Sequence, residues 1–215
     1  MKFGVLGSGM VGSTIATKLV SLGHEVKVGS RNAANGKAAA WAASAGRGAS
    51  QGTFADAAAF GEIVFNCTAG VGSIDALRSA GASALRGKIL IDIANPLDFS
   101  KGMPPTLFVS NGDSLGETIQ RTFPEAKVVK ALNTVNAGLM VAPGRLRGDH
   151  DLFVCGNDAG AKAQVVRFLK EEFGWKSVID LGDITAARGT ESYLLLWLRL
   201  YGALQTADFN VHVVN

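Results

Sequence analysis

The chain has 215 residues, of which 47% are apolar and 18% are charged, and its formal net charge is +3. This composition is typical of a globular protein and argues against disordered and fibrous classes. So small a charge, with no run of Lys or Arg, argues against nucleic-acid binding. The longest late apolar stretch, 193–204, is interrupted by Arg199 and falls short of the roughly 20 residues of a membrane span. We therefore expect a cytoplasmic protein with no membrane contact.

Short apolar runs alternate with helix-length segments over the first 96 residues. The strand-like runs are continuous rather than alternating, as in a sheet that is covered on both faces. Ser73 is expected to cap the third helix. Strands are predicted at 2–7, 24–30, 61–70 and 87–96, and helices at 10–22, 36–46 and 73–85. The alternation predicts an α/β fold with a Rossmann-type, doubly wound parallel sheet.

The pattern loosens after Pro96, where a loop-rich stretch with a short strand at 107–110 is expected. A helix at 114–123 begins with a capping box formed by Ser114 and Glu117. Further strands are predicted at 126–134, 150–158 and 177–183, with helices at 159–174 and 185–205. We expect residues 1–130 to form the Rossmann domain and 131–215 a small C-terminal α/β extension.

The motif G-x-G-x-x-G follows the first strand and opens the first helix. In this context the first glycine makes a tight turn, the second allows a pyrophosphate to approach the backbone, and the third allows close packing of helix and strand. The helix N-terminus offers unpaired N–H groups to the anion. The predicted dinucleotide-binding residues are Gly7, Ser8, Gly9, Met10, Val11 and Gly12.

The end of the second strand predicts which dinucleotide binds. NAD enzymes place an acidic residue there, which would repel a 2′-phosphate, whereas this chain has Ser30, Arg31 and Asn32. A hydroxyl, a guanidinium and an amide suit a phosphate dianion. Lys37 either adds long-range attraction or is an ordinary solvated lysine. NADP(H) is therefore the predicted cofactor.

Ligands of open α/β sheets bind beyond the carboxyl ends of the strands. Here these ends carry small neutral groups, which admit a flat ring beside the nicotinamide, although each can equally be a loop or capping residue. The cofactor-side residues are Thr68, Ala69, Asn95 and Pro96, and the acceptor-side candidates are Asn133, Thr134 and Asn136.

No general acid stands out for the reduction of a carbonyl or imine. The chain has no Tyr-x-x-x-Lys pair, and Lys130 and His150, the two candidates, are expected to be surface or strand-end residues. Cys67 and Cys155 are expected to be buried structural thiols, and no metal-binding cluster is predicted. A flavin-like ring that stabilises its own charge needs positioning more than acid catalysis.

Several segments, in this order, resemble the NADPH-dependent coenzyme F420 oxidoreductase family. They are "GSGMVGSTIATKLVSLGHEVKVGSRN", "DIANPLDFSKGMPPTL", "VVKALNT", "FVCGND" and "DLGDITAARGTE". The resemblance implies a homodimer that exchanges hydride between NADP(H) and a deazaflavin. It implies that Ser8, Ser30 and Arg31 contact the 2′-phosphate, that 9–11 contact the pyrophosphate, and that the segment after "VVKAL" faces the second cofactor.

The chain departs from this family at Asn133, where archaeal members have a histidine. A flavin, a quinone or another small molecule is therefore an alternative to coenzyme F420. An imine or carbonyl reductase and a non-catalytic NADPH sensor are the other functions that we consider. The aromatic-rich helical segment 193–201 forms either a dimer interface or part of the core.

Overall fold

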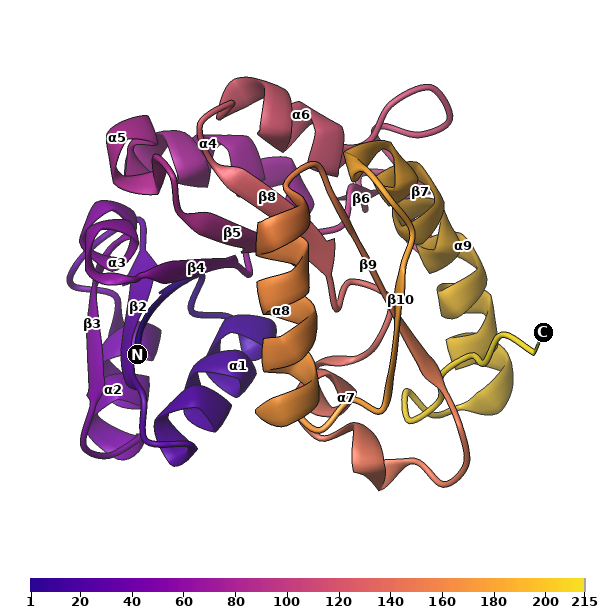
Figure 1. The fold of residues 1–215 in the computed structure, drawn as a ribbon, viewed down its shortest axis with the longest axis horizontal. Coiled ribbons are helices and arrows are strands. Elements are labelled where there is room, and N and C mark those ends of the chain that lie inside the picture. Colours follow the sequence, from indigo (N-terminus) through magenta and orange to yellow (C-terminus); the bar gives the residue numbers. More distant parts are fainter. Residues whose placement is uncertain (215) are drawn as a thin grey trace.

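The structure is a computed structural model, and it describes residues 1–214. Over these residues one sheet has eight strands in the order β10-β9-β8-β5-β4-β1-β2-β3 (Figure 1). Its strands are β1 (Lys2–Leu6), β2 (Glu25–Ser30), β3 (Ala49–Thr53), β4 (Ile63–Asn66), β5 (Ile89–Asp92), β8 (Lys127–Ala131), β9 (Asp151–Gly156) and β10 (Ser177–Asp180). A separate antiparallel pair joins β6 (Leu97–Asp98) to β7 (Thr106–Leu107).

Helices cover both faces of the sheet (Figure 1). They are α1 (Met10–Ser21), α2 (Gly36–Ser44), α3 (Phe54–Phe60), α4 (Gly70–Ala80), α5 (Ala82–Leu85), α6 (Leu115–Thr122), α7 (Ala137–Val141), α8 (Ala159–Glu171) and α9 (Ala187–Leu204), with short 3₁₀ turns η1 (Pro143–Arg145) and η2 (Ile184–Ala186). No helix within residues 1–214 is long and apolar enough to cross a bilayer.

Each face of the sheet has its own hydrophobic core, because successive strand side chains point to opposite faces. Phe3 and Phe65 lie on the face covered by α1, α2, α7 and α8, where their ring centroids are 5.5 and 6.2 Å from that of Phe168. Leu6 and Val64 lie on the other face, under α3, α4, α5 and α6. The prediction of a sheet covered on both sides is confirmed.

The Rossmann-type α/β fold is confirmed, but some local predictions were wrong. The helix predicted over 73–85 begins earlier, at Gly70, and is divided at Gly81, whose φ is 92°. Ser73 is therefore no N-cap; it is buried inside α4, where its hydroxyl contacts Asn66 and Thr68. β3 and α3 were not predicted at all.

The sheet continues past residue 130. All its neighbouring strands are parallel except β8 and β9, which pair antiparallel from Val129↔Gly156 to Ala131↔Val154. β9 and β10 thus continue the N-terminal sheet, but they run antiparallel to its other strands. The division into domains at residues 130 and 131 stays a prediction.

A buried ion cluster joins three elements beside the ends of β5 and β8. The ammonium of Lys130 lies 2.8 Å from a carboxylate oxygen of Asp92 and 2.7 Å from one of Glu191 on α9, and all three side chains are at most 2% exposed. Glu191 also accepts hydrogen bonds from the N–H groups of Leu115 and Gly116 at the start of α6. Of the two expectations for Lys130, the strand-end position is confirmed and the surface position was wrong, since this residue lies near the end of β8 and its side chain is wholly buried.

Burial alone would lower the pKa of Lys130, but the neighbouring charges of Asp92 and Glu191 outweigh it and hold that pKa above its ordinary value. The lysine is therefore charged at neutral pH. Its three protons are directed at Asp92, at Glu191 and at the carbonyl of Ala94. The cluster is fully paired, and it ties α9 and α6 to the sheet.

We expect Lys130→Met to lower the free energy of unfolding by about 3–5 kcal/mol, because it leaves two buried carboxylates without their cation. Urea denaturation measures this change. Lys127→Met is the matched control, since it removes only the half-exposed pair with Asp158 and should cost less than about 1 kcal/mol. Equal losses in the two variants would contradict the assigned role of the cluster.

Candidate cofactor-binding site

A cavity of about 530 Å³ opens at the carboxyl ends of β1, β2 and β4. We call it the cofactor cavity. Its walls come from the loop at 7–9, the end of β2, the start of α3, and the segment that leads from β4 into α4. The lining residues are Gly7, Ser8, Gly9, Ser30, Arg31, Asn35, Phe54, Cys67, Thr68, Ala69, Val71, Gly72, Asp75, Ala76 and Ser79.

The G-x-G-x-x-G segment, residues 7–12, is compact because two of its glycines lie against backbone. Gly7 has a φ of 117°, a value that residues other than glycine rarely adopt. A Cβ on Gly12 would stand 1.9 Å from the carbonyl oxygen of Gly7. The turn after β1 and the first turn of α1 therefore touch, as the motif predicts.

Gly9 differs from these two glycines, because a Cβ built there meets nothing within 4 Å. The open space belongs to the cofactor cavity, which Gly9 lines. Gly9 is also the N-cap of α1, and no side chain caps that helix. The N–H groups of its first turn have no partner within the helix, and the helix begins at a residue that lines an opening which a ligand can enter.

A second helix N-terminus borders the same cavity. Ala69 precedes α4 and supplies no capping side chain. By contrast, Asn35 caps α2 and Asp158 caps α8, each accepting a hydrogen bond from an N–H in the first turn. Two uncapped helix ends beside one opening suit a ligand with negative charge.

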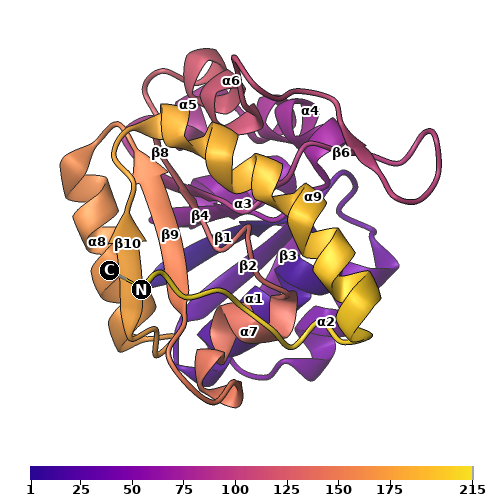
Figure 2. The same cartoon turned by 90° about the vertical axis from the view of Figure 1, so that its right-hand side faces the viewer.

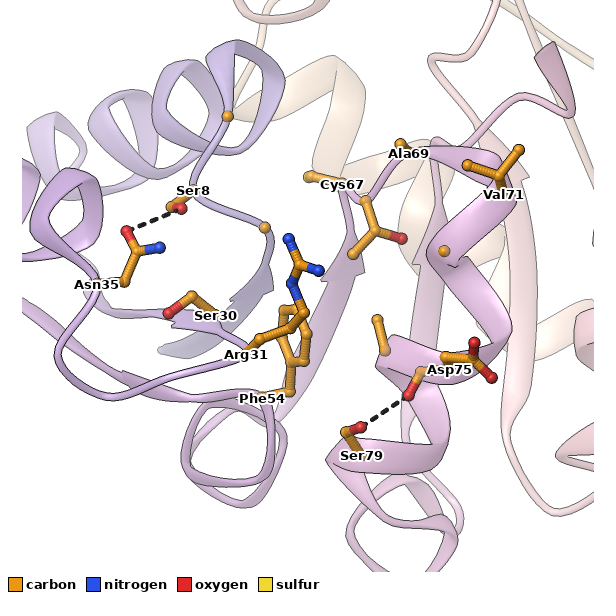
Figure 3. A pocket seen from close by; sticks show the side chains of 15 residues that line it. Ser8, Ser30, Arg31, Asn35, Phe54, Cys67, Ala69, Val71, Asp75 and Ser79 are labelled. Atoms are coloured by element: carbon orange, nitrogen blue, oxygen red, sulfur yellow. Dashed lines mark hydrogen bonds between the residues drawn. The ribbon is translucent and has the colours of Figure 1, made fainter. Parts of the chain in front are cut away.

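Ser30 and Arg31 lie at the end of β2 and line the cavity. Ser30 is buried, and its hydroxyl donates to the carbonyl oxygen of Asn32 at 2.7 Å. Figure 3 shows the Arg31 side chain extending into the space between the loop at 7–9 and α4. No carboxylate within residues 1–214 lies at ion-pair distance from the guanidinium of Arg31. Its charge is available to an anion.

Ser8 faces the same opening from the loop. Its hydroxyl donates to Oδ1 of Asn35 at 3.3 Å, and Asn35 also accepts from the N–H of Ala38 at 3.0 Å. The pair holds the N-terminus of α2 against the loop after β1 (Figure 3). Asn35 was not among the predicted site residues.

The structure brings seven of the predicted cofactor residues to the cavity and leaves the others outside its lining. Met10 is exposed, and Val11 and Gly12 pack beneath the loop. Asn32 turns its side chain to the N–H of Ala34, and Lys37 lies on the exposed side of α2. The residues inside the lining are Gly7, Ser8, Gly9, Ser30, Arg31, Thr68 and Ala69.

Asn95 and Asn133 pair with each other rather than facing the cavity. The amide of Asn95 donates to the backbone oxygen of Asn133 at 2.9 Å, and the Asn133 amide donates to Oδ1 of Asn95 at 2.9 Å. Pro96 is buried next to Asn95. A Cβ on Gly70 would stand 1.9 Å from the carbonyl oxygen of Asn95, so this pair supports the start of α4.

The three acceptor-side candidates do not line the cavity either. Asn133 and Thr134 are each 2% exposed, and their Oδ1 and Oγ1 atoms have no hydrogen-bond partner within residues 1–214. Asn136 caps α7 and donates through its amide to the carbonyl of Ala207 and to Asp208. It ties the segment after α9 to the loop after β8.

One wall of the cavity was not predicted from the sequence. It is the face of α4 that carries Val71, Gly72, Asp75, Ala76 and Ser79. The spacing of three and four residues places them on one side of a helix. That spacing is present in the sequence, but it carries no glycine motif or charge pattern that marks a ligand site.

The two thiols lie in different surroundings. Cys155 is buried as predicted, and burial raises its pKa to about 12. Cys67 is only half-buried and lines the cofactor cavity, so the prediction of a buried structural thiol was wrong for this residue. Burial, together with the nearby charge of Asp92, raises the pKa of the Cys67 thiol as well, so it stays protonated at neutral pH.

The other candidate acid, His150, is far from the cavity. Its ring contacts the carbonyl of Pro143 and the amide of Asn210, and it lines a smaller pocket near η1. Within the described residues, no three His, Cys, Asp or Glu side chains are grouped so as to hold a metal ion.

The fold and the cavity define a dinucleotide-binding protein of the Rossmann type. Residues 2–96 match the family model described as NADP oxidoreductase, coenzyme F420-dependent. A crystal structure from Arthrobacter sp. FB24, provisionally described as an F420-dependent NADP-reductase, is 56% identical, with a TM-score of 0.94 and full coverage of both chains. The chain belongs to this family of NADP oxidoreductases.

Two curated relatives are longer. The F420-dependent NADP reductase of Methanocaldococcus jannaschii is 32% identical over 61% of this chain and 58% of its own length. The metalloreductase STEAP3 of Rattus norvegicus is 30% identical over 89% of this chain, which spans 36% of that protein. An imine reductase from Streptomyces aurantiacus is 18% identical over 95% of this chain and 64% of its own, with a TM-score of 0.69, a likeness that shows the fold alone.

We expect Gly9→Ala and Gly12→Ala to fail in different ways. The Gly9 variant places a methyl group in the open cavity, so NADPH affinity should fall at least about tenfold, while stability changes by under about 1 kcal/mol. The Gly12 variant forces α1 away from Gly7, and it should lose about 1–3 kcal/mol of unfolding free energy. Thermal denaturation measures the change in stability and fluorescence titration the change in NADPH affinity. A stability loss as large at Gly9 as at Gly12 would contradict the open space assigned to Gly9.

Proposed function

We propose that the protein is an NADP(H)-dependent oxidoreductase that transfers hydride between NADPH and a deazaflavin, coenzyme F420, or a flavin-like acceptor. The observation that carries this proposal is the unpaired guanidinium of Arg31 in the cofactor cavity, beside the open backbone at Gly9. Family membership supports it. The chain spans little more than half of the curated F420-dependent relative.

The residues present fit NADP(H). The uncapped start of α1 adjoins the open space at Gly9, where a pyrophosphate would approach and accept from the first N–H groups of the helix. Arg31 would bind a 2′-phosphate through charged hydrogen bonds, and the Ser30 hydroxyl would leave the carbonyl of Asn32 to donate to the same group. Ser8 would join them from the loop. Asn32 and Lys37 would act only at longer range.

Bound NADPH supplies a hydride, two electrons with one proton, from C4 of its nicotinamide ring. Reduction of the acceptor also consumes one proton. Within the described chain the cavity lining holds no Lys, His or Tyr, and the Cys67 thiol has a raised pKa. In this proposal the proton comes from solvent, and the protein's contribution is to position and shield the two rings. This favours an acceptor that stabilises its own negative charge.

Thr68 and Ala69 form the part of the lining nearest the expected nicotinamide position. The Thr68 hydroxyl donates to Oδ1 of Asn66 at 2.7 Å, and the Asn66 amide donates to Asp92 at 2.7 Å. This chain of hydrogen bonds fixes Thr68 against the buried ion cluster. Asn95, Pro96, Asn133 and Thr134 would support this wall from behind.

A non-catalytic NADPH sensor is the second candidate. The observation that favours it is the burial of Asn133 and Thr134, together with the engagement of Asn136 by the segment after α9. In this alternative the cavity binds NADPH, and no acceptor reaches the ring. An imine or carbonyl reductase requires a proton donor beside the substrate, and the described lining of the cavity holds no Lys, His or Tyr for that role.

We further propose that the protein is a cytoplasmic homodimer that pairs through α9. Figure 2 shows α9 crossing the front of the molecule, with its second half toward α2. From its middle to its end α9 exposes Leu195, Leu196, Tyr201 and Leu204, each 44–54% accessible. A second copy of the same helix would cover these apolar side chains.

We expect Arg31→Ala to weaken NADPH binding about 10- to 150-fold, because it loses a charged hydrogen-bond pair, and to leave NADH binding unchanged.

Absorbance at 340 nm, followed with coenzyme F420, FAD, FMN and a quinone in turn, measures turnover. Oxidation with one acceptor would support the oxidoreductase. Tight binding without oxidation in any mixture would favour the sensor, and equal use of NADH and NADPH would refute the cofactor assignment.

The dimer has its own test. Sedimentation velocity should give a dimer for the wild-type protein and a monomer for Leu196→Glu, because a buried unpaired carboxylate disrupts the apolar contact. NADPH affinity should be unchanged in this variant. A wild-type monomer at micromolar concentration would contradict the proposed interface.

A further inference from the structure

The α4 wall of the cofactor cavity carries a carboxylate, that of Asp75, more than one helical turn beyond the uncapped N-terminus. Val71, Asp75 and Ser79 follow one another at intervals of four residues and face the cavity, across from Arg31. Figure 3 shows Asp75 and Ser79 on the far side of the opening from Ser8 and Ser30. An acidic wall would repel a phosphate, so this face must serve another part of the ligand.

The chemistry of NADP(H) indicates which part that is. The ribose that carries the 2′-phosphate also carries the adenine base. If Ser30 and Arg31 hold the phosphate, the base lies in the same region of the cavity, between Arg31 and α4. Phe54, Val71 and Ala76 give this region apolar surface. A flat aromatic base suits such a lining.

Asp75 is the acceptor that this wall offers. Its carboxylate is exposed, and within residues 1–214 its side chain has one neighbour of opposite charge, Arg78 at a loose 3.4 Å. The other polar groups nearby are already engaged. The Ser79 hydroxyl donates to the backbone oxygen of Asp75 at 2.8 Å, and Asn35 accepts from both Ser8 and Ala38.

We propose that Asp75 reads the base of the dinucleotide and selects adenine, an inference that rests on the proposed NADP(H) site. A carboxylate accepts hydrogen bonds but donates none. The exocyclic amine of adenine donates to it, whereas a base with a carbonyl oxygen at the same position, such as hypoxanthine, meets a second acceptor. Asp75 is thus a specificity residue that acts on the part of the cofactor remote from hydride transfer.

The test compares dissociation constants for NADPH and for its reduced deamino analogue, which carries hypoxanthine, by fluorescence titration. The wild-type protein should bind NADPH roughly three- to tenfold more tightly than the analogue. Asp75→Ala should bring the ratio near one by weakening NADPH. Asp75→Asn should also bring it near one, but by strengthening the analogue, because an amide both donates and accepts.

Glu125→Gln is the matched control, since it removes an exposed carboxylate and a surface ion pair with Arg86 outside the cavity. It should keep the wild-type ratio, and all variants should keep the wild-type preference for NADPH over NADH. An unchanged base preference in Asp75→Ala, or none in the wild-type protein, would overturn the inference while leaving the 2′-phosphate site standing. Failure of the wild-type protein to prefer NADPH over NADH would instead count against the proposed function itself.

Discussion

The site depends on one close contact, between the carbonyl of Gly7 at the end of β1 and the α-carbon of Gly12 in α1. A methyl group at Gly12 would stand 1.9 Å from that oxygen, so the helix can approach the strand only without a side chain there. The contact aims the first turn of α1 at the cofactor cavity. From this placement follow the open space at Gly9 and the direction in which the helix presents its free N–H groups.

The helix N-termini that border the cofactor cavity carry no side-chain cap. α2, α3, α6, α7 and α8 begin with side-chain caps from Asn35, Thr53, Ser114, Asn136 and Asp158, which satisfy first-turn N–H groups internally. α1 and α4, whose N-termini border the cavity, have none, and neither do α5 and α9, whose residues do not line it. The donors of α1 and α4 are left for a ligand, and the unpaired charge of Arg31 adds to the same field.

Much of the fold followed from the sequence, because glycine spacing and continuous apolar strands report backbone geometry directly. β3 and α3 did not, since the strand sequence "ASQGT" has neither β-branched runs nor alternation, and it is held by pairing with β2. Thr53 and Asp56 do form a capping box at the start of α3, a local signal that could have revealed that helix. β9 was predicted as a strand, but its antiparallel direction has no local signal, because strand direction depends on partners distant in the sequence.

The functional site, like the fold, was predicted only in part from the sequence. Ser30 and Arg31 were predicted from their chemistry at the end of a strand, and both line the cavity. The α4 wall and the buried Lys130 were not foreseen, because each depends on contacts between elements distant in the sequence. Lys130 in particular is charged in the core only because Asp92 comes from β5 and Glu191 from α9. Neither of these two contacts can be predicted from the sequence of β8 alone.

The central claim is that this cavity binds the 2′-phosphate of NADP(H) through Ser30 and Arg31. The most direct measurement is a calorimetric comparison of adenosine 2′,5′-bisphosphate with adenosine 5′-monophosphate, which differ only in that phosphate and need no acceptor. The bisphosphate should bind at least about tenfold more tightly, with an advantage that shrinks as salt screens the charge. Equal affinity of the two compounds at low salt would contradict it.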